Sequence, residues 1–513
     1  MDYKYHNFYE LITAQGKKRK SKVALLVDNQ KITYGQILKS ADSVAGFLAE
    51  KGIKKGDKVA LFLRNSPEFI YTIFAVSKLG AIVVPINTFL KEEELSYILE
   101  DSGSKILVAS SIYDKVVNSS KATSLCEYIL WKGEELVEGI QHLHYNDALA
   151  YEKSVEPQTN LLDEIAVLIY TSGTTGKPKG AMLSNKNILS NADAGQRTIN
   201  VKPSDRAIVF LPMFHSFTFS IGVMLPMYVG SSIVIIKSIQ PFSNIFKQTL
   251  TKRVTLFFGI PDVYNALARA KLPWYFMWFN SIRAFISGAA ALQPKTLDAM
   301  ATKFKGATLL EGYGLSEASP AVCMNTFEKQ KAGSVGTALH SYEMKIVDED
   351  MNEVSNGSIG DIIVKGDNVM QGYLNRPEAT DETIINGWLL TGDMGYMDDD
   401  GFLFIVDRKK DLIISKGINI YPRETEEVMD VFEGVRASAV IGIVDEKSGE
   451  APVAYVELEE GVAVLDEVGL KKYMREHLAN YKVPKQIHII DELPKNATGK
   501  VLKRLLKEQL RDV

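Results

Sequence analysis

Short apolar runs alternate with amphipathic stretches through the first part of the chain. The runs 58–63, 81–86 and 105–109 have the length and β-branched content of buried strands, while 67–79 and 92–100 repeat apolar residues at helical spacing. Strands that alternate with helices are typical of α/β proteins. The pattern therefore predicts an α/β fold for this part of the chain.

The same alternation returns further along, where several strands end in glycine or proline. Strand candidates are 207–211, 232–236, 255–258, 284–286 and 308–310. Their ends read FFGIP, FISGAAA and LLEGYG. In open α/β sheets ligands bind beyond the carboxyl ends of the strands, so we expect the glycine-ended strands to surround one crevice.

The pattern changes near residue 331, where short strands are separated by frequent turns. This predicts a small β-barrel or sandwich, and an α+β tail of about 100 residues, within the usual size of a domain, follows it. We therefore expect a large N-terminal domain, 1–408, with two α/β subdomains to about residue 330 and a β-barrel at about 331–408. A mobile α+β C-terminal domain, 409–513, completes the expected fold.

Composition narrows the class of protein. The 513 residues are too many for one core, and 46% hydrophobic with 24% charged residues is typical of a globular protein. A net charge of −4 gives no general electrostatic reason to bind nucleic acid. Two cysteines without metal-ligand spacing indicate a reducing compartment. With neither a signal-peptide core nor about 20 consecutive apolar residues, the chain is expected to be cytoplasmic.

A glycine-rich loop follows the apolar run 166–169 and reads YTSGTTGKPKG at 170–180. Its glycines let backbone N–H groups converge, its hydroxyls add donors, and Lys177 and Lys179 add positive charge, which suits a nucleoside triphosphate. The common P-loop is excluded because Pro178 follows Lys177 where that motif needs a hydroxyl. Taken alone, the loop could equally be a solvated turn after a strand.

Five further segments occur in order after this loop: LPMFHSFTF at 211–219, EGYGLSEASP at 311–320, WLLTGDMG at 388–395, DRKKD at 407–411 and LPKNATGKVLKR at 493–504. With the loop they resemble the adenylate-forming acyl-CoA synthetase superfamily over nearly the whole chain. The spacing is most similar to that of bacterial medium- or long-chain fatty-acid–CoA ligases.

The resemblance implies a two-step reaction with ATP, a fatty acid and coenzyme A as substrates and Mg²⁺ as the metal. A carboxylate attacks the α-phosphate of ATP to give acyl-adenylate and pyrophosphate, and the thiol of coenzyme A then displaces AMP. Because two anions must approach each other, the site needs cations. Lys500 matches the family's lysine that bridges the α-phosphate and the carboxylate. The alternative interpretation is a lone surface lysine without a catalytic role.

The resemblance also implies the other ligands of ATP. Glu317 matches the magnesium-binding glutamate and Thr171 a hydroxyl near the same ion, and both offer the oxygen atoms that a hard cation prefers. Asp393 is expected to accept hydrogen bonds from the ribose hydroxyls, and Arg408 to contact the ribose or phosphate. The remaining ATP-binding positions expected are Ser172, Gly173, Thr174, Thr175, Gly176, Lys177, Gly288, Ala289, Ala290, Glu311, Gly312, Tyr313 and Ser316.

The C-terminal domain must move between the two steps, because Lys500 is needed first and the thiol needs a path afterwards. Lys410 matches the family's hinge position. Gly417 matches a glycine that lines the pantetheine tunnel, where a Cβ atom would narrow the passage. Lys416 departs from the Gly-Gly pair common in relatives.

The acyl site is expected around His215, which matches a position that gates or lines it in the family; a satisfied core histidine is the alternative. Its neighbours Phe214 and Phe217, with Gly259 and Gly314, are the other expected lining residues. Amino-acid-activating relatives usually hold an aspartate where His215 stands, so an amino-acid substrate is not expected. The apolar run 219–227 suits an alkyl slot and a buried helix equally well.

The segment KLPWYFMWFN, 271–280, holds five aromatic residues. Trp274 and Trp278 are four residues apart, so one helical face could carry both to a membrane surface or to the mouth of an acyl tunnel. Packing in the core or in a homodimer interface is the favoured alternative. A basic run at 17–22 could also touch anionic lipid, but a solvated loop is the simpler interpretation.

Rival functions share the same motifs. A fatty-acyl-AMP ligase would hand its adenylate to a carrier protein, but the insertion that such enzymes commonly carry is not discernible here. An aryl-acid–CoA ligase comes next, and oxygen assays would test a luciferase-like activity. A catalytically silent acyl- or nucleotide-binding protein would need a broken site, whereas Glu317, Asp393, Arg408 and Lys500 are all present.

Overall fold

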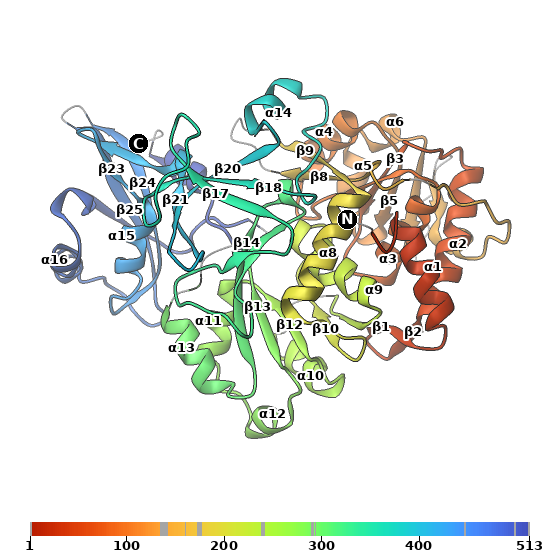
Figure 1. The fold of residues 1–513 in the computed structure, drawn as a ribbon, viewed down its shortest axis with the longest axis horizontal. Coiled ribbons are helices and arrows are strands. Elements are labelled where there is room, and N and C mark those ends of the chain that lie inside the picture. Colours follow the sequence, from red (N-terminus) through yellow and green to blue (C-terminus); the bar gives the residue numbers. More distant parts are fainter. Residues whose placement is uncertain are drawn as a thin grey trace.

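The computed structural model describes residues 3–133, 142–159, 161–171, 177–237, 242–288, 292, 294–445, 448–496 and 499–510. Figure 1 shows two α/β units on one side, a β unit beside them, and a C-terminal unit, in blue, at the opposite end.

The first α/β sheet has seven strands in the order β7-β6-β5-β3-β4-β8-β9, and all neighbours are parallel except β8 and β9. The strands are β3 (Lys58–Phe62), β4 (Ile82–Pro85), β5 (Ser104–Ser110), β6 (Tyr128–Lys132), β7 (His142–His144), β8 (Ile165–Thr171) and β9 (Lys179–Ser184). The helices of this part are α1 (Phe8–Lys18), α2 (Tyr34–Glu50), α3 (Pro67–Lys78), α4 (Glu92–Ser102), α5 (Asp114–Ser119), α6 (Ala122–Leu125) and α7 (Tyr145–Leu149).

The second sheet has nine strands in the order β16-β15-β14-β13-β12-β10-β11-β1-β2, parallel from β14 to β1. The strands are β1 (Val23–Val27), β2 (Gln30–Thr33), β10 (Arg206–Val209), β11 (Ser232–Ile235), β12 (Leu256–Gly259), β13 (Ala284–Ser287), β14 (Thr308–Gly314), β15 (Ala321–Met324) and β16 (Thr337–Ala338). Its helices are α8 (Asn185–Ile199), α9 (Leu225–Val229), α10 (Ser243–Thr251), α11 (Pro261–Arg269), α12 (Trp274–Phe279) and α13 (Pro294–Lys303).

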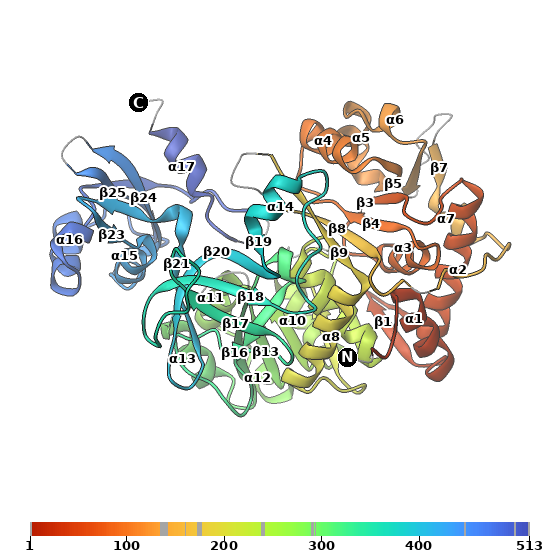
Figure 2. The same cartoon turned by 45° about the horizontal axis from the view of Figure 1, so that its top comes forward.

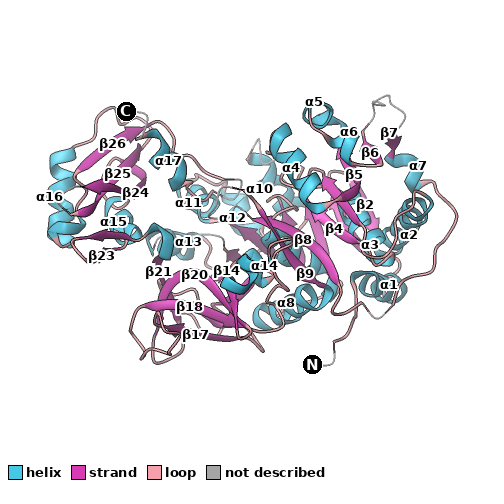
Figure 3. Cartoon of the chain, turned by 90° about the horizontal axis from the view of Figure 1, so that it is seen from above, coloured by secondary structure: helices cyan, strands magenta, loops and turns pink. Residues whose placement is uncertain are grey.

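The two sheets share an inner layer of helices (Figure 3). The largest apolar cluster joins α1, α2, α3, α8 and α9 to one face of each sheet, while separate clusters hold α10–α13 and α4–α6 against the outer faces. Alternate residues of a strand point to opposite faces. In β10, Ala207 and Val209 therefore belong to the inner cluster and Ile208 to the outer one. The α/β class predicted from the sequence is confirmed.

The unit predicted as a β-barrel is an antiparallel sheet in the order β17-β18-β20-β19, with β21 also paired to β20. The ten-residue β20 pairs with β19 near its start and with β21 near its end. Each of these two strands therefore pairs with only part of β20. In the described residues no pairing joins β17 to β21, so the sheet stays open. Its elements are β17 (Glu343–Val347), β18 (Gly360–Lys365), α14 (Pro377–Thr383), β19 (Ile384–Ile385), β20 (Trp388–Met397) and β21 (Leu403–Arg408).

The C-terminal unit has its own sheet, in the order β23-β22-β25-β24 with β26 parallel to β25. Its two apolar clusters contain only residues from Ile413 onward, and Figure 2 shows the unit apart from the α/β sheets. We therefore propose to keep the domain limit at 408/409. Its elements are β22 (Ile413–Ser415), β23 (Ile418–Ile420), α15 (Pro422–Met429), β24 (Val435–Asp445), β25 (Gly449–Leu458), α16 (Glu467–His477), β26 (Gln486–Ile490) and α17 (Lys503–Gln509).

Among the helices that the structure describes, none combines the length and the apolar character needed to cross a bilayer.

Candidate active site

The carboxyl ends of β12, β13 and β14 lie side by side. The pairing register sets Gly259 beside Ser287 and Ser287 beside Glu311, and the Gly288 N–H donates to the Gly259 carbonyl at 3.4 Å. Several of the residues expected at one crevice therefore share one sheet edge. Beyond β14, the chain turns back as β15 and leaves the Tyr313–Glu317 segment at the same edge.

Packing within the chain already explains two of the glycines expected to line the acyl pocket. A Cβ atom on Gly314 would stand 1.8 Å from the Pro320 carbonyl oxygen, and one on Gly259 would stand 2.8 Å from the Tyr264 ring. A Cβ atom on Gly288 would meet the Phe217 ring at 3.2 Å. Gly259 and Gly314 are thus required by their neighbours, and their contact with an acyl chain stays a prediction.

Glu317 is held by two hydroxyl groups from different elements. Its Oε1 atom accepts hydrogen bonds from Thr171 Oγ1 at 3.3 Å and from the Tyr373 phenol at 2.9 Å. Tyr373 is bridged to Ala181 of β9, and Lys179 Nζ lies 5.2 Å from the centre of its ring. Burial, followed by the Glu317 charge, raises the pKa of Tyr373, so the phenol stays a donor at neutral pH.

The chemistry of this pair suits a magnesium ion. Mg²⁺ in nucleotide sites usually takes one or two carboxylates together with substrate phosphates rather than an all-protein cage. Glu317 and Thr171 place a carboxylate and a hydroxyl oxygen 3.3 Å apart, at the end of the strand that precedes the glycine-rich loop. In the part of the chain that the structure describes, no group of three or more His, Cys, Asp or Glu residues could hold a metal by itself.

Asp393 and Arg408 face each other across the pairing of β20 and β21. One carboxylate oxygen of Asp393 accepts a 2.6 Å hydrogen bond from the Tyr313 phenol, and the other lies 3.4 Å from Arg408 Nε. That nitrogen is buried and makes no hydrogen bond within the described residues, so a polar group of a ligand would satisfy it. Burial raises the pKa of Tyr313 well above its usual value, which keeps this phenol protonated.

Lys500, in a loop of the C-terminal unit, lies near the Asp393–Arg408 pair. Its loop is closed by the bridge between Lys495 and Val501, and Lys495 Nζ lies 3.4 Å from Asp262 at the start of α11. Burial, followed by the nearby charge of Arg408, lowers the pKa of Lys500 to about 8. The charges of Asp393 and Asp411 oppose this shift. The loop thus carries a partly buried ammonium to the Asp393–Arg408 pair.

Two more contacts hold the C-terminal unit in this position. Arg423, at the start of α15, donates from Nη1 to the Ile405 carbonyl at 2.9 Å, and Arg269 lies 3.9 Å from Glu459. The charge of Arg423 also reaches Glu311. Burial raises the pKa of this carboxyl to about 7, while the hydrogen bond from the Leu292 N–H and then the charge of Arg423 oppose the rise.

His215 is a neutral imidazole at the edge of the expected acyl site. Burial lowers its pKa to about 4, and its Nδ1 atom accepts the Phe217 N–H at 3.3 Å. Ser216 and Ser316 share a 2.9 Å hydrogen bond, which joins this segment to the one that bears Glu317. The ring of Phe214, the residue before His215, packs against the ring of Phe89, with ring centres 6.4 Å apart.

The apolar run 219–227 is a buried helix. It lies in a π-helical segment, Thr218–Met224, that continues into α9, and all of these residues are buried. Six members of the run belong to the inner core cluster. Of the two alternatives that the sequence left open, the buried helix is therefore the one observed.

Not every expected residue reaches this place. Gly417 stands in the exposed turn between β22 and β23 with a φ of +76°, where a Cβ atom would meet no other atom within 4 Å. Its positive φ by itself favours glycine here, and its place beside the pantetheine stays a prediction. Lys177 lies over the Tyr97 ring at 5.4 Å. Lys410, in the 3₁₀ turn after β21, does lie near the site: burial, followed by the charge of Arg408, lowers its pKa, and the charges of Asp411 and Asp393 oppose this shift. Expected residues outside the described part are Ser172, Gly173, Thr174, Thr175, Gly176, Ala289 and Ala290.

The structure adds residues that sequence reasoning missed. Tyr373 lies 56 positions from Glu317, and Ser216 lies 100 positions from Ser316. No local pattern links either pair, because each meets only when separate units pack together. Ser216 adjoins His215, so its membership of the same segment was the one available signal.

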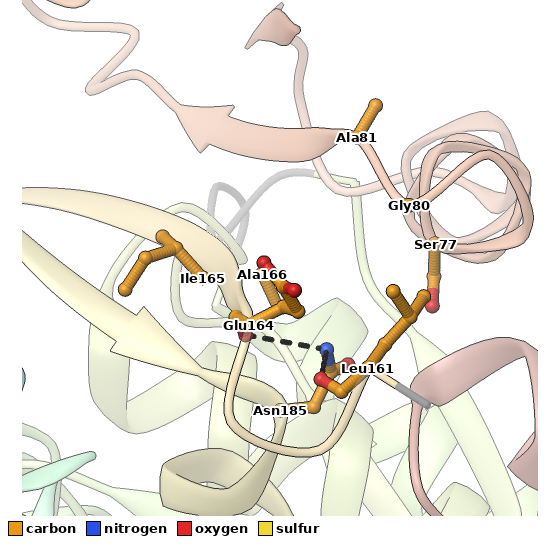
Figure 4. A pocket seen from close by; sticks show the side chains of 8 residues that line it. All are labelled: Ser77, Gly80, Ala81, Leu161, Glu164, Ile165, Ala166 and Asn185. Carbon is orange, nitrogen blue, oxygen red and sulfur yellow. Dashed lines mark hydrogen bonds between the residues drawn. The ribbon is translucent and has the colours of Figure 1, made fainter. Parts of the chain in front are cut away.

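A small cavity elsewhere does not belong to this site. It is lined by residues at the start of β8 and the end of α3, where Asn185 donates to the Leu161 and Glu164 carbonyls (Figure 4). It has room for about one water molecule. The glycine-rich loop begins at the other end of the seven-residue β8, roughly 20 Å away at about 3.3 Å per residue.

Two family models match the chain. The AMP-binding enzyme model matches residues 12–374, and the AMP-binding enzyme C-terminal domain model matches residues 424–500. The segment between these spans contains Asp393, Arg408 and Lys410.

Known proteins resemble the chain over nearly its whole length. A long-chain-fatty-acid–CoA ligase of Bacillus subtilis is 36% identical, over 97% of this chain and 94% of the relative. An anthranilate CoA ligase solved with anthranoyl-AMP is 28% identical, with a TM-score of 0.92 over 99% of this chain and 98% of that one. MatB from Rhodopseudomonas palustris is 30% identical over 99% of both chains, with a TM-score of 0.89 for its ATP-bound structure and 0.77 for its apo structure.

Replacing Tyr373 tests whether its phenol positions Glu317. Tyr373→Phe removes one of the two hydroxyl donors to this carboxylate, and hydrogen bonds to charged groups contribute about 1.5–3 kcal/mol. We therefore expect ATP to bind about tenfold more weakly in the presence of Mg²⁺. Without Mg²⁺ the change should be small. Isothermal titration calorimetry with Mg²⁺ and with EDTA measures both.

Tyr396→Phe is the matched control, because it removes a phenol that stacks on Phe404 in the neighbouring sheet. It should leave ATP binding unchanged under both conditions. Equal loss of affinity with and without Mg²⁺ in Tyr373→Phe would contradict a role in positioning the metal ligand.

Proposed function

The chain belongs to the AMP-binding enzyme family and is an AMP-forming acid–CoA ligase, and we propose that the acid it activates is a medium- or long-chain fatty acid. The observation that carries the proposal is the position of Lys500, in the C-terminal unit, near enough to Arg408 and Asp393 of the other part for their charges to shift its pKa. The family's shared chemistry needs a cation where two anions meet. Lys500 offers one.

In the first step, a carboxylate oxygen of the acid attacks the α-phosphorus of ATP, and the bond to the bridging oxygen of pyrophosphate breaks. We propose that Lys500 neutralises both anions as they approach and that Asp393 and Arg408 hold the ribose. Mg²⁺, when bound, neutralises the phosphate oxygens and orients the leaving pyrophosphate. Glu317 and Thr171 are the proposed protein ligands of the ion, and Tyr373 holds the Glu317 carboxylate in position.

In the second step, the sulfur of coenzyme A attacks the acyl carbon and the bond to AMP breaks. Gly417 is exposed in the turn between β22 and β23, where a Cβ atom would meet no other atom within 4 Å, so its proposed role beside the pantetheine requires the C-terminal unit to rotate. We propose that the rotation occurs at Lys410, in the 3₁₀ turn Lys409–Asp411 that follows β21. The better match to the ATP-bound than to the apo relative supports the adenylation step as the state described.

Two features of the expected acyl site support a fatty acid. An amino-acid substrate would need an anion to pair with its ammonium, but the residue after Phe214 is His215, a buried neutral imidazole. Phe217 packs on Phe258, which makes the neighbourhood apolar. An aryl acid is the second candidate, because a ligase of anthranilate has a closely similar fold.

Peripheral membrane contact, a homodimer, a cytoplasmic location and the magnesium ion remain predictions from the sequence. Of these, only the metal takes part in the proposed reaction, and its proposed protein ligands are Glu317 and Thr171.

A panel of acids tests the proposed substrate. Pyrophosphate release is measured with C4 to C18 fatty acids, benzoates and amino acids, with and without coenzyme A. We expect the highest kcat/KM with a fatty acid, no turnover of amino acids, and multiple turnovers only with coenzyme A. A preference for benzoates would replace the fatty acid with an aryl acid, and turnover that needs a carrier protein in place of coenzyme A would overturn the proposed acceptor.

The two half-reactions test the role of Lys500. Lys500→Ala should lower the rate of acyl-adenylate formation at least about 100-fold, the usual effect of removing one group that stabilises developing charge. It should largely spare thioester formation from supplied acyl-adenylate, because the domain has then rotated. Single-turnover assays with each substrate measure the two steps separately.

Arg504→Ala is the matched control, since Arg504 is an exposed cation on α17 paired with Glu508. It should change neither step. Equal loss of both steps in Lys500→Ala would refute the rotation of the domain.

The pH dependence of adenylation follows from the lowered pKa of Lys500. In the free enzyme this lysine loses its proton as the pH rises through about 8, and the neutral amine cannot neutralise two anions. The kcat/KM for ATP should therefore fall about tenfold per pH unit above pH 8. Because bound triphosphate favours the ammonium, kcat should hold to higher pH. Lys500→Arg, which stays charged, should flatten the profile; a wild-type profile that is level to pH 10 would contradict this assignment.

A further inference from the structure

Helix α12 exposes an aromatic patch that core packing does not explain. Of its residues, Trp274 is 71% exposed, Tyr275 47%, Trp278 80% and Phe279 65%, and we call these four the α12 patch. Phe276 alone among the aromatics is buried, against Phe246 of α10 with ring centres 5.4 Å apart. Packing in the core, one half of the favoured alternative, is therefore wrong for four of the five aromatic residues, and packing in a homodimer interface stays a prediction.

The patch lies at one pole of the molecule, away from the nucleotide site. In Figure 1 α12 forms the lower extremity, below α10 and β13. The helix precedes β13, whereas Gly288 follows the strand at its opposite end. A partner or surface bound at α12 would therefore leave the carboxyl ends of β12, β13 and β14 accessible to ligands.

The neighbourhood of the patch is strongly basic. Between Phe242 and Arg283 the chain holds six lysines and arginines and one acidic residue, Asp262. Asp262 lies next to Lys495 of the C-terminal unit. Arg269 and Arg283 have acidic partners. Within the described residues, no ion pair is recorded for the other four: Lys247, Lys252, Arg253 and Lys271.

These four basic residues lie on segments at the same end of the molecule as α12. Lys271 comes three positions before Trp274, and Lys247 follows the Phe246 that anchors α12. At the edge of the sheet the Arg283 N–H donates to the Thr255 carbonyl at 2.9 Å, so the turn that holds Arg253 and the segment that leaves α12 run side by side. Basic residues thus lie on the chain segments that flank the exposed aromatic rings.

We propose that the α12 patch docks the protein on the surface of a membrane that contains anionic lipid. Tryptophan and tyrosine favour the boundary between headgroups and acyl chains, and lysine and arginine are attracted to anionic headgroups. A six-residue helix is about 9 Å long, so it would lie in the interface and not cross the bilayer. The net charge of the whole chain is −4, so the local basic cluster would also orient the approach.

Charge argues against a second copy of this chain as the occupant. A two-fold contact through the α12 patch would set the same basic residues against themselves, and like charges that face each other are unfavourable. An anionic lipid surface has the opposite charge and accepts the exposed rings. The lipid surface therefore fits both features of the patch.

Vesicle flotation of the whole protein tests the proposal without any activity measurement, so its outcome does not depend on the proposed substrate. Wild type should float with vesicles of phosphatidylcholine and phosphatidylglycerol, and much less with phosphatidylcholine alone or at high salt. Lys247→Ala with Lys271→Ala should weaken binding about 25-fold, since one cation near such a surface is worth about fivefold. Trp274→Ala with Trp278→Ala should weaken it at least tenfold.

Two control pairs remove equivalent exposed groups elsewhere. Lys17→Ala with Lys18→Ala removes exposed cations from the end of α1, and Val464→Ala with Val468→Ala trims side chains that are 81% exposed in the C-terminal unit. Neither should change flotation. The proposal is overturned if wild type does not float, if it floats equally with uncharged vesicles, or if a control pair reduces binding as much. It is also overturned if sedimentation shows that the tryptophan pair converts a dimer to a monomer.

Discussion

The repulsion between two anions is the constraint on which this structure depends. A carboxylate and a phosphate 4 Å apart repel each other by about 4 kcal/mol per pair of unit charges at an effective dielectric constant of about 20. In the proposed mechanism the chain meets this constraint with cations from two units: Arg408 at the end of β21 and Lys500 in a loop of the C-terminal unit. Because one proposed cation sits on each side of the proposed domain limit, the proposed site would be complete only when the two units are together.

The same arrangement explains why Lys500 has an unusual environment. Its ammonium is partly buried and lies near Arg408, so its charged form is disfavoured until a ligand with negative charge arrives. Asp393 and Asp411 limit this effect. In the proposed mechanism a bound triphosphate would relieve the remaining unfavourable energy and would thereby couple the docking of the C-terminal unit to the presence of the nucleotide.

Asp393 and Glu317 of the candidate site are each held by a hydrogen bond from a tyrosine phenol. Tyr313 donates to Asp393 and Tyr373 donates to Glu317, and burial raises the pKa of both phenols. Each tyrosine therefore remains a donor at neutral pH and fixes one carboxylate oxygen, and the other oxygen of Asp393 lies 3.4 Å from Arg408 Nε. Tyr313 is supplied by β14 and Tyr373 by the chain that bridges to β9, so strand packing sets both carboxylate positions.

The sequence by itself determined the α/β class, the glycine-ended strands and the residues of the ordered motifs, because these depend on residue type and on short-range periodicity. Only the tertiary structure decided which residues meet. It joined Tyr373 to Glu317 and Ser216 to Ser316, left the sheet of β17 to β21 open, and placed Gly417 in an exposed turn. It also showed that α12 is anchored through Phe276 with most of its aromatic rings exposed. The physical reason is that a hydrophobic pattern shows that a side chain can be buried, whereas the neighbours that would bury it come from parts of the chain dozens of residues away.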